Sequence, residues 1–232
     1  MNFAGLPERL AHIRDEIAHR LQAGGWTHPV TIVAVTKGFG PDAVRAALAA
    51  GLPEIGENRV QEAVEKMAQV PDAGVTWHLI GHLQRNKAKL VPGRFALVHS
   101  VDSVDLAHEL ARRAEAAGRR QPVLVQVNLA GEEQKSGCTP ADAPALVREV
   151  AALQSLALEG LMTMAPFTDA VGVQRRTFRG LRQLRDALQE EGVWLPKLSM
   201  GMSGDYATAV EEGATVIRLG TALFGTRTTA GP

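Results

Sequence analysis

The pattern that decides the fold is VLVQV at Val123–Val127, followed by PADAPALVREVAAL at Pro140–Leu153 and LALEGL at Leu156–Leu161. The first and third segments are short and apolar, which is typical of buried strands, whereas the middle segment has the length of a helix. Parallel neighbouring strands need a crossover connection, and a helix usually provides it. This stretch therefore predicts one parallel strand–helix–strand unit.

The same alternation runs through the rest of the chain. The predicted strands are Thr31–Val35, Glu54–Ile55, Thr76–Ile80, Ala96–His99, Val123–Val127, Leu156–Leu161, Lys197–Met200 and Thr215–Leu219. The predicted helices between them are Pro41–Ala50, 58–69, Gln84–Leu90, Ser103–Ala117, Pro140–Leu153, Val171–Glu190 and Gly204–Glu212. Eight such units in 232 residues favour one closed (β/α)₈ barrel of the TIM type, although an open doubly wound sheet fits the same alternation.

The barrel core is expected to cover about residues 30–227 of a single domain spanning 1–232. Before the first strand, Leu10, Ile13, Ile17 and Leu21 recur at helical spacing, which predicts an extra amphipathic helix at the N-terminus.

Composition excludes several classes of protein. The chain has 25 Lys and Arg against 25 Asp and Glu, so its net charge favours neither a nucleic acid nor an anionic membrane as partner. Its single cysteine, Cys138, cannot form an intramolecular disulfide, and the N-terminus lacks a basic-then-apolar signal pattern. We therefore expect a cytoplasmic protein.

Polar and glycine residues gather where the predicted strands end, which is where barrel enzymes place their sites. Lys37 follows the first strand closely. A lysine shielded from water there offers a neutral amine to a carbonyl compound. The alternative is a lysine whose ammonium group simply reaches water at the rim, and position alone leaves this alternative open.

Two glycine-containing segments follow the last two predicted strands. Ser199–Asp205 (SMGMSGD) leads into a helix, and Gly220-Thr221 follows the final strand. Phosphate sites in barrels are often built from these two loops, because free backbone N–H groups and hydroxyls converge there. A phosphate site combined with Lys37 would suit pyridoxal 5'-phosphate (PLP), whose aldehyde reacts with an amine.

Arg218 also has two interpretations. Beside the pyridine nitrogen of PLP, an arginine would keep that nitrogen unprotonated and weaken the ring as an electron sink. Alternatively, Arg218 pairs with a carboxylate of the barrel. Two histidines have an ordinary interpretation as well: His78 and His82 lack an acidic partner for a zinc motif, so we expect structural or pocket-lining side chains and no metal site.

A row of arginines lies along the predicted helix 171–190. Arg175, Arg179, Arg182 and Arg185 lie opposite its apolar residues and predict a solvated helix face rather than a nucleic-acid contact.

Seven segments together resemble the pyridoxal phosphate homeostasis protein family, and they occur in order from about Val30 to Arg227. The segments are Ala34-Val35-Thr36-Lys37, Gly56-Glu57-Asn58, WHLIGHLQRNK at Trp77–Lys87, Lys135-Ser136-Gly137, GLMTM at Gly160–Met164, SMGMS at Ser199–Ser203 and VIRLGT at Val216–Thr221. No single segment is specific, but the set is.

The resemblance implies a barrel similar to the N-terminal domain of alanine racemase, with PLP held as a Schiff base on Lys37. It also implies a role for each remaining site residue: Ser203, Gly220 and Thr221 would hold the phosphate, Arg218 would face the pyridine nitrogen, and Asn58 and Met200 would pack near the ring. Many members of the family carry another lysine shortly after the Schiff-base lysine, whereas Gly38 and Phe39 occupy that place here, although Lys87 and Lys135 remain.

The resemblance further implies a role in vitamin B6 and amino-acid homeostasis, with little or no catalytic turnover. Apo PLP enzymes are possible recipients of the cofactor, and the chain is expected to be a monomer or weak homodimer. The alternative is a racemase of the alanine racemase type, which needs a second base from an additional β domain for which this chain has no room. A third interpretation is a barrel enzyme for a phosphorylated metabolite in which Lys37 is an acid or base.

Overall fold

The short apolar runs become the strands of a closed parallel barrel. The computed structural model describes residues 3–71, 74–131 and 136–226. Its strands are β1 Thr31–Val35, β2 Glu54–Glu57, β3 Thr76–Leu79, β4 Leu97–Val101, β5 Gln121–Gln126, β6 Leu156–Met162, β7 Lys197–Met202 and β8 Val216–Leu219. Each strand pairs with the next in sequence, and β8 returns to pair with β1. The predicted barrel is confirmed, and the open sheet is wrong.

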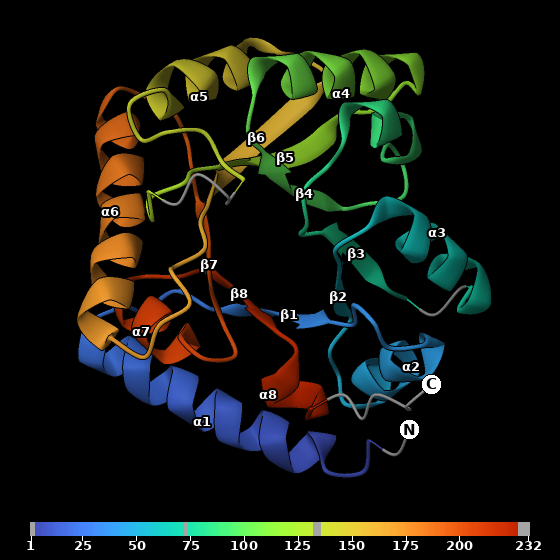
Figure 1. Ribbon diagram of the computed structural model, residues 1–232, viewed down its shortest axis with the longest axis vertical. Coiled ribbons are helices and arrows are strands. Elements are labelled where there is room, and N and C mark those ends of the chain that lie inside the picture. The colour runs from blue at the N-terminus through green and yellow to red at the C-terminus, as the bar shows by residue number, and fades with distance from the viewer. Residues whose placement is uncertain (1–2, 72–73, 132–135, 227–232) are drawn as a thin grey trace.

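Helices surround the barrel (Figure 1). They are α1 Leu6–Gly24, α2 Pro41–Ala49, α3 Val60–Gln69, the 3₁₀ helix η1 Arg85–Leu90, α4 Val104–Ala116, α5 Ala143–Ala152, α6 Val171–Glu190, α7 Tyr206–Glu211 and α8 Thr221–Phe224. The extra N-terminal helix is confirmed as α1. Helix α8, directly after β8, was not predicted, because four residues carry too little periodicity to show one.

Strand β2 is two residues longer than predicted, because Gly56 belongs to the strand rather than to a turn. A Cβ atom at Gly56 would lie 2.8 Å from Cγ1 of Val33 on the neighbouring strand. Glycine is therefore needed here for the close approach of a side chain, and the strand continues through it to Glu57.

Two regions of packing lie on opposite sides of the sheet. The region between the strands and the helices, called the outer layer, is one continuous apolar cluster that includes Ile55, Leu79, Leu110 and Phe178. Successive strand residues point to opposite faces, so alternate side chains fill the barrel interior instead. The interior contains two small apolar clusters, Val33, Val35, Ile80 and Val216 in one and Leu97, Leu124 and Met162 in the other.

Helix α1 and the residues just after it contact α7 and α8. Nε of Arg9 donates a hydrogen bond of 2.6 Å to the carbonyl of Leu223 in α8. Nε1 of Trp26 donates to the carbonyl of Glu211 in α7 at 2.8 Å, and Arg20 forms an ion pair with the Glu211 carboxylate. Helix α1 therefore packs against α7 and α8.

The arginines of α6 do more than cover a solvated face. Arg175, Arg179 and Arg182 all donate to the carboxylate of Glu212, whose side chain is 3% exposed. Burial raises the pKa of Glu212, but these hydrogen bonds outweigh burial and lower it overall. The prediction of a solvated stripe needs correction, because a buried carboxylate requires donors and draws these side chains to it.

Candidate functional site

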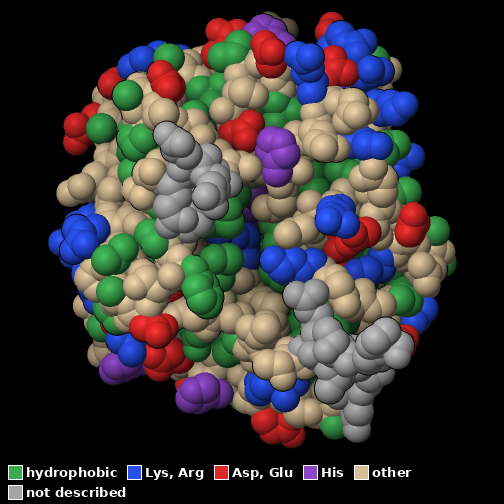
Figure 2. All heavy atoms as spheres, in the orientation of Figure 1, with side chains coloured by type: hydrophobic (Ala, Val, Ile, Leu, Met, Phe, Trp, Pro, Cys, Tyr) green, Lys and Arg blue, Asp and Glu red, His purple; other side chains and the backbone are tan. Residues whose placement is uncertain are grey.

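The carboxyl ends of β1, β7 and β8 bring Lys37, Ser203, Gly220 and Thr221 to one end of the barrel. Strand β8 lies between β1 and β7, so the residues that follow these three strands are neighbours. Lys37 follows β1 with an exposed side chain, and Asn58 follows β2 with a partly buried one. Figure 2 shows Lys and Arg side chains around a hollow near the middle of the molecule.

Backbone N–H groups converge on one point between β7 and β8. The N–H groups of Gly220 and Ala222 both donate to Oγ of Ser203, at 3.2 and 3.1 Å. A phosphate oxygen is an acceptor of the same kind. Helix α7 starts only at Tyr206 and has six residues, so this cradle depends on individual N–H groups and not on a long helix.

The lysine and the cradle are adjacent. Ala34 pairs with Leu219 in the β1–β8 register, and a Cβ atom at Gly220 would lie 3.6 Å from the carbonyl oxygen of Val35. Lys37 is two residues beyond Val35, and Thr221 directly follows Gly220. An amine and a group of N–H donors, of a kind that can bind a phosphate, therefore lie at the same corner of the barrel.

Arg218 lies beneath this corner, inside the barrel. Its side chain is 4% exposed, and it donates to Oγ of Ser199 at 2.7 Å and to the carbonyl of Thr163 at 3.0 Å. Burial lowers the pKa of Arg218 to about 10, although Asp205 opposes this effect. The guanidinium is still protonated at neutral pH, and its hydrogen bonds go to a hydroxyl and a carbonyl instead of a carboxylate.

A line of hydrogen bonds extends from Arg218 across the barrel interior. Nδ1 of His99 lies 2.8 Å from Oγ of Ser199, and Nε2 of His99 lies 2.9 Å from Nδ1 of His78. Nε2 of His78 lies 2.5 Å from Oε2 of Glu54. We call Glu54, His78, His99, Ser199 and Arg218 the interior chain.

Sequence reasoning missed most of the interior chain, because it treated Arg218 alone. His78 was expected to be structural or pocket-lining, which agrees with its burial, but His99, Ser199 and Glu54 were not considered as a set. The signal was available in part: polar residues at alternate positions of strands that otherwise read as apolar predict a polar face.

Other predicted residues take different places. Ser199 points into the barrel, so the alternation of β7 turns Met200 outward, and its fully buried side chain belongs to the outer layer. This position does not support the expectation that Met200 packs near a ring in the mouth. His82 is exposed, with Nδ1 lying 3.3 Å from the Asp102 carboxylate, and Lys87 is partly buried in η1. Lys135 lies outside the described residues.

A buried ion pair supports the end of β1. Lys66 of α3 pairs with Glu57 at the end of β2, and its Nζ also donates to the carbonyl of Thr36 at 2.9 Å. The hydroxyl of Thr36 donates to the same Glu57 oxygen at 2.5 Å. This ion pair fixes the residue just before Lys37, although Oε2 of Glu57 has no hydrogen-bond partner among the described residues.

Fold and site together define a class of barrel with a lysine after the first strand and a phosphate-type cradle after the last two. The family model of the alanine racemase N-terminal domain matches residues 12–228. An alanine racemase of Clostridium difficile superposes with a TM-score of 0.75 over 93% of this chain and 61% of the racemase, at 17% identity. That likeness shows the fold alone.

The chain belongs to the pyridoxal phosphate homeostasis protein family. The pyridoxal phosphate homeostasis protein of Aquifex aeolicus is 41% identical over 222 residues, which are 95% of this chain and 97% of that protein. PipY of Synechococcus elongatus, in a structure with PLP bound, has 40% identity and a TM-score of 0.83, over 95% of this chain and all of PipY.

Among the described residues, no helix is long and apolar enough to cross a membrane.

Proposed function

We propose that the chain binds PLP through a Schiff base on Lys37 and helps to balance vitamin B6 and amino-acid pools without significant turnover. Its family membership supports this proposal, since a relative of 40% identity has been seen with PLP bound. The observation that carries it is the adjacency of Lys37 to the cradle of Ser203, Gly220 and Ala222.

The donors present fit the chemical groups of PLP. When bound, PLP supplies an aldehyde that condenses with an amine and a ring that withdraws electrons. Lys37 would provide the amine, while Ser203, Gly220 and Thr221 would bind the phosphate. Asn58 would border the ring, and its backbone is held closely by Gly81, where a Cβ atom would lie 2.3 Å from the Asn58 carbonyl oxygen.

Arg218 would face the pyridine nitrogen as a donor. A guanidinium with a pKa of about 10 has no proton acceptor to offer and gives up no proton at neutral pH. A pyridine nitrogen that accepts a hydrogen bond without gaining a proton is a weak electron sink, which supports binding over catalysis.

The position of the single tyrosine also favours a carrier over a racemase. Tyr206 begins α7 and packs against the outer layer. Burial raises its pKa, and the nearby carboxylate of Glu16 in α1 raises it further, although Arg20 opposes both. A hydroxyl that faces α1 is poorly placed to remove a proton from a substrate in the mouth of the barrel.

Absorption spectroscopy with mass mapping tests the proposal. Purified protein with added PLP should show an imine band that borohydride abolishes, with the pyridoxyl mass on Lys37. Lys37→Ala should lose both signals, whereas Lys89→Ala, an exposed lysine of η1, should keep them. A label spread over surface lysines would mean that the cradle serves a different phosphorylated ligand.

Chiral chromatography of L-alanine and other amino acids incubated with the PLP-loaded protein separates carrier from racemase. We expect no accumulation of D-amino acids above a protein-free PLP control. Rapid racemisation would establish the enzyme instead. Transfer of PLP to an apo enzyme, followed by the activity regained, would test the proposed recipients in the cytoplasm.

A further inference from the structure

We infer that Glu54, His78, His99 and Ser199 are positioning residues that act as one directed hydrogen-bond chain to orient the Arg218 guanidinium toward the mouth of the barrel. This inference rests on the proposed function only for the ligand that Arg218 would meet. The interior chain itself consists of hydrogen bonds between residues that the structure describes.

The interior chain of hydrogen bonds crosses the whole barrel. Glu54 begins β2, His78 lies in β3, and His99 lies in β4. Ser199 lies in β7, which is separated from β4 by two strands on one side of the closed barrel and by four on the other, so the contact between His99 and Ser199 crosses the interior. Arg218 in β8 completes the line. Interior side chains of five strands are thus joined by consecutive contacts of 2.5–2.9 Å.

In each link of the interior chain, the previous link determines which atom donates the hydrogen bond. The Glu54 carboxylate can only accept, so Nε2 of His78 donates to it. When Nε2 of His78 donates to Glu54, the lone pair on Nδ1 of His78 is an acceptor, so Nε2 of His99 donates to it. His99 is neutral, because burial lowers its pKa well below 6.5 and the positive charges of Arg218 and Lys197 lower it further. Its Nδ1 therefore accepts the proton of the Ser199 hydroxyl.

This direction determines what Ser199 offers Arg218. With its proton engaged by His99, the hydroxyl oxygen presents only lone pairs to the guanidinium, and a hydroxyl that donates is also a better acceptor. Arg218 is then held by two acceptors, Oγ of Ser199 and the carbonyl of Thr163. Because a guanidinium is planar and rigid, fixing it on one side fixes where its other N–H groups point.

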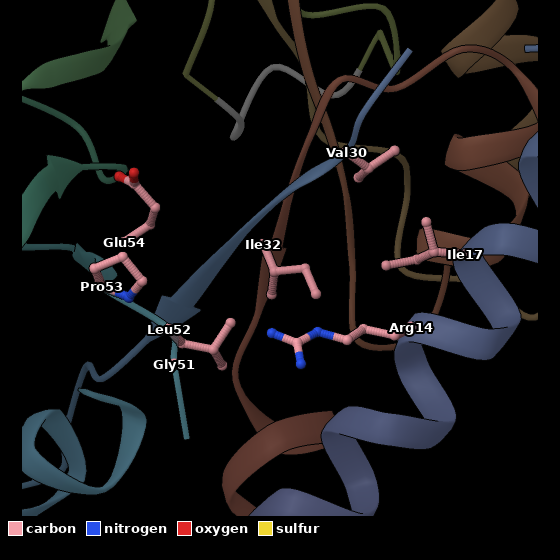
Figure 3. Close-up of a pocket in the computed structure, with 8 residues that line it drawn as sticks. All are labelled: Arg14, Ile17, Val30, Ile32, Gly51, Leu52, Pro53 and Glu54. Carbon is pink, nitrogen blue, oxygen red and sulfur yellow. The ribbon is translucent and has the colours of Figure 1, made fainter. Parts of the chain in front are cut away.

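The Glu54 end of the chain faces solvent at the opposite mouth. Glu54 lines a pocket of about 240 Å³ with residues of α1, β1 and the segment before β2, and its side chain is 29% exposed (Figure 3). The carboxylate oxygens of Glu54 accept hydrogen bonds, so this end of the interior chain is an acceptor. Arg218 forms the other end of the interior chain and is buried, with 4% of its surface exposed.

The first test measures ¹⁵N shifts of the histidine rings in the cofactor-free protein, with His99→Gln used for assignment. We expect both His78 and His99 to carry the proton on Nε2 and to lack it on Nδ1. A proton on Nδ1 of His99 would reverse the last link and overturn the inference, whether or not PLP binds.

The second test asks whether the chain acts as a unit. Glu54→Gln removes a charge that is two links from His99, without touching His99. The ring shifts of His99 should move in this variant if the links are coupled. Shifts confined to His78 would show separate pairs and contradict a single chain.

The third test uses PLP titrations followed by absorbance. Ser199→Ala removes one of two acceptors of a charged donor, so we expect the dissociation constant to rise about tenfold. Ser100→Ala is the matched control, because Ser100 is equally buried in β4 but bonds the carbonyl of Gly81 outside the chain. It should change the constant less than about twofold.

An equal rise in the PLP dissociation constant for Ser199→Ala and Ser100→Ala would overturn the positioning role of Ser199. Failure of the unsubstituted protein to bind PLP would instead disprove the proposed function, and the ring shifts would still decide whether the directed chain exists.

Discussion

The outer layer and the barrel interior use the two faces of the same eight strands in opposite ways. The outer layer is one apolar cluster that runs from α1 to α8, whereas the interior divides its apolar residues into two small clusters and places hydrogen-bonded polar side chains within the barrel. Burial is similar on both faces, with Phe178 and His99 both fully buried. The two faces differ in the kind of contact that burial produces, which is apolar packing in the outer layer and hydrogen bonding in the interior.

This difference indicates a division between stability and function. Apolar burial is non-directional and scales with area, so the outer layer can stabilise the fold without fixing any one geometry. A buried polar chain must satisfy every donor and acceptor, so it contributes less net stability but specifies orientation. The predictions below compare the two regions, beginning with the largest effect.

Truncating the outer layer should cost the most stability. Phe178→Ala removes the largest fully buried side chain of α6 and should lower the free energy of unfolding by about 3–5 kcal/mol. Urea unfolding measures this change, and Val171→Ala, at a half-exposed position of the same helix, is the control. A cost no larger than that of the control would contradict the assignment of stability to this layer.

The Lys66–Glu57 ion pair is a buried polar contact beside the otherwise apolar outer layer, and Lys66→Met tests its contribution to stability. It leaves the Glu57 carboxylate buried without its cation and should cost about 3 kcal/mol in urea unfolding. Adding Glu57→Leu should restore most of the loss, because replacing both partners removes the uncompensated charge. If the double variant is as unstable as the single one, the ion pair does more than balance its own charges.

His99→Gln tests the interior through pH. His99 has a pKa well below 6.5 in the folded protein, so below pH 6.5 the unfolded chain binds a proton that the folded protein does not. Stability from this group is complete above pH 6.5 and is lost as the pH falls toward the folded pKa. The variant should remove up to about 1.4 kcal/mol per pH unit of this slope. Urea unfolding between pH 7 and pH 5 measures it, and identical slopes would contradict the prediction.

A surface pair outside both regions should show the smallest effect. Hydrogen bonds from Arg112, and then Arg113, lower the pKa of Glu109 to about 2. Arg112→Ala should raise the pKa of Glu109 toward its usual range, as followed by ¹³C NMR of the carboxyl carbon, with only a small loss of stability at neutral pH, because solvent screens this surface pair. A large loss of stability would show that exposed charges matter here as much as either buried region.

The outer layer was far easier to predict from the sequence than the interior. Runs such as Val123–Val127 and the apolar spacing in α1 and α6 show the strands and helices directly, because hydrophobic periodicity reports which face is buried. The corner formed by Lys37, Ser203 and Gly220 was also predictable, since it follows from strand order alone.

The interior could not be predicted, because its contacts depend on how the barrel closes. Which residues of β4 and β7 face each other is set by register and stagger, which the sequence does not display. His99 and Ser199 are 100 residues apart and look unremarkable in isolation. Met200 shows the same limit, since a single step along β7 turns its side chain from the mouth to the outer layer.

The contacts of α1 have a consequence for synthesis of the chain. The apolar stripe of this helix includes Leu6, Leu10 and Ile13, and its partners in α7 and α8 lie about 200 residues later. A ribosome makes α1 about 200 residues before it makes α7 and α8. The side of α1 that packs on α7 and α8 therefore stays uncovered while the intervening residues are made, and chaperones that bind apolar helices can reach it during that time.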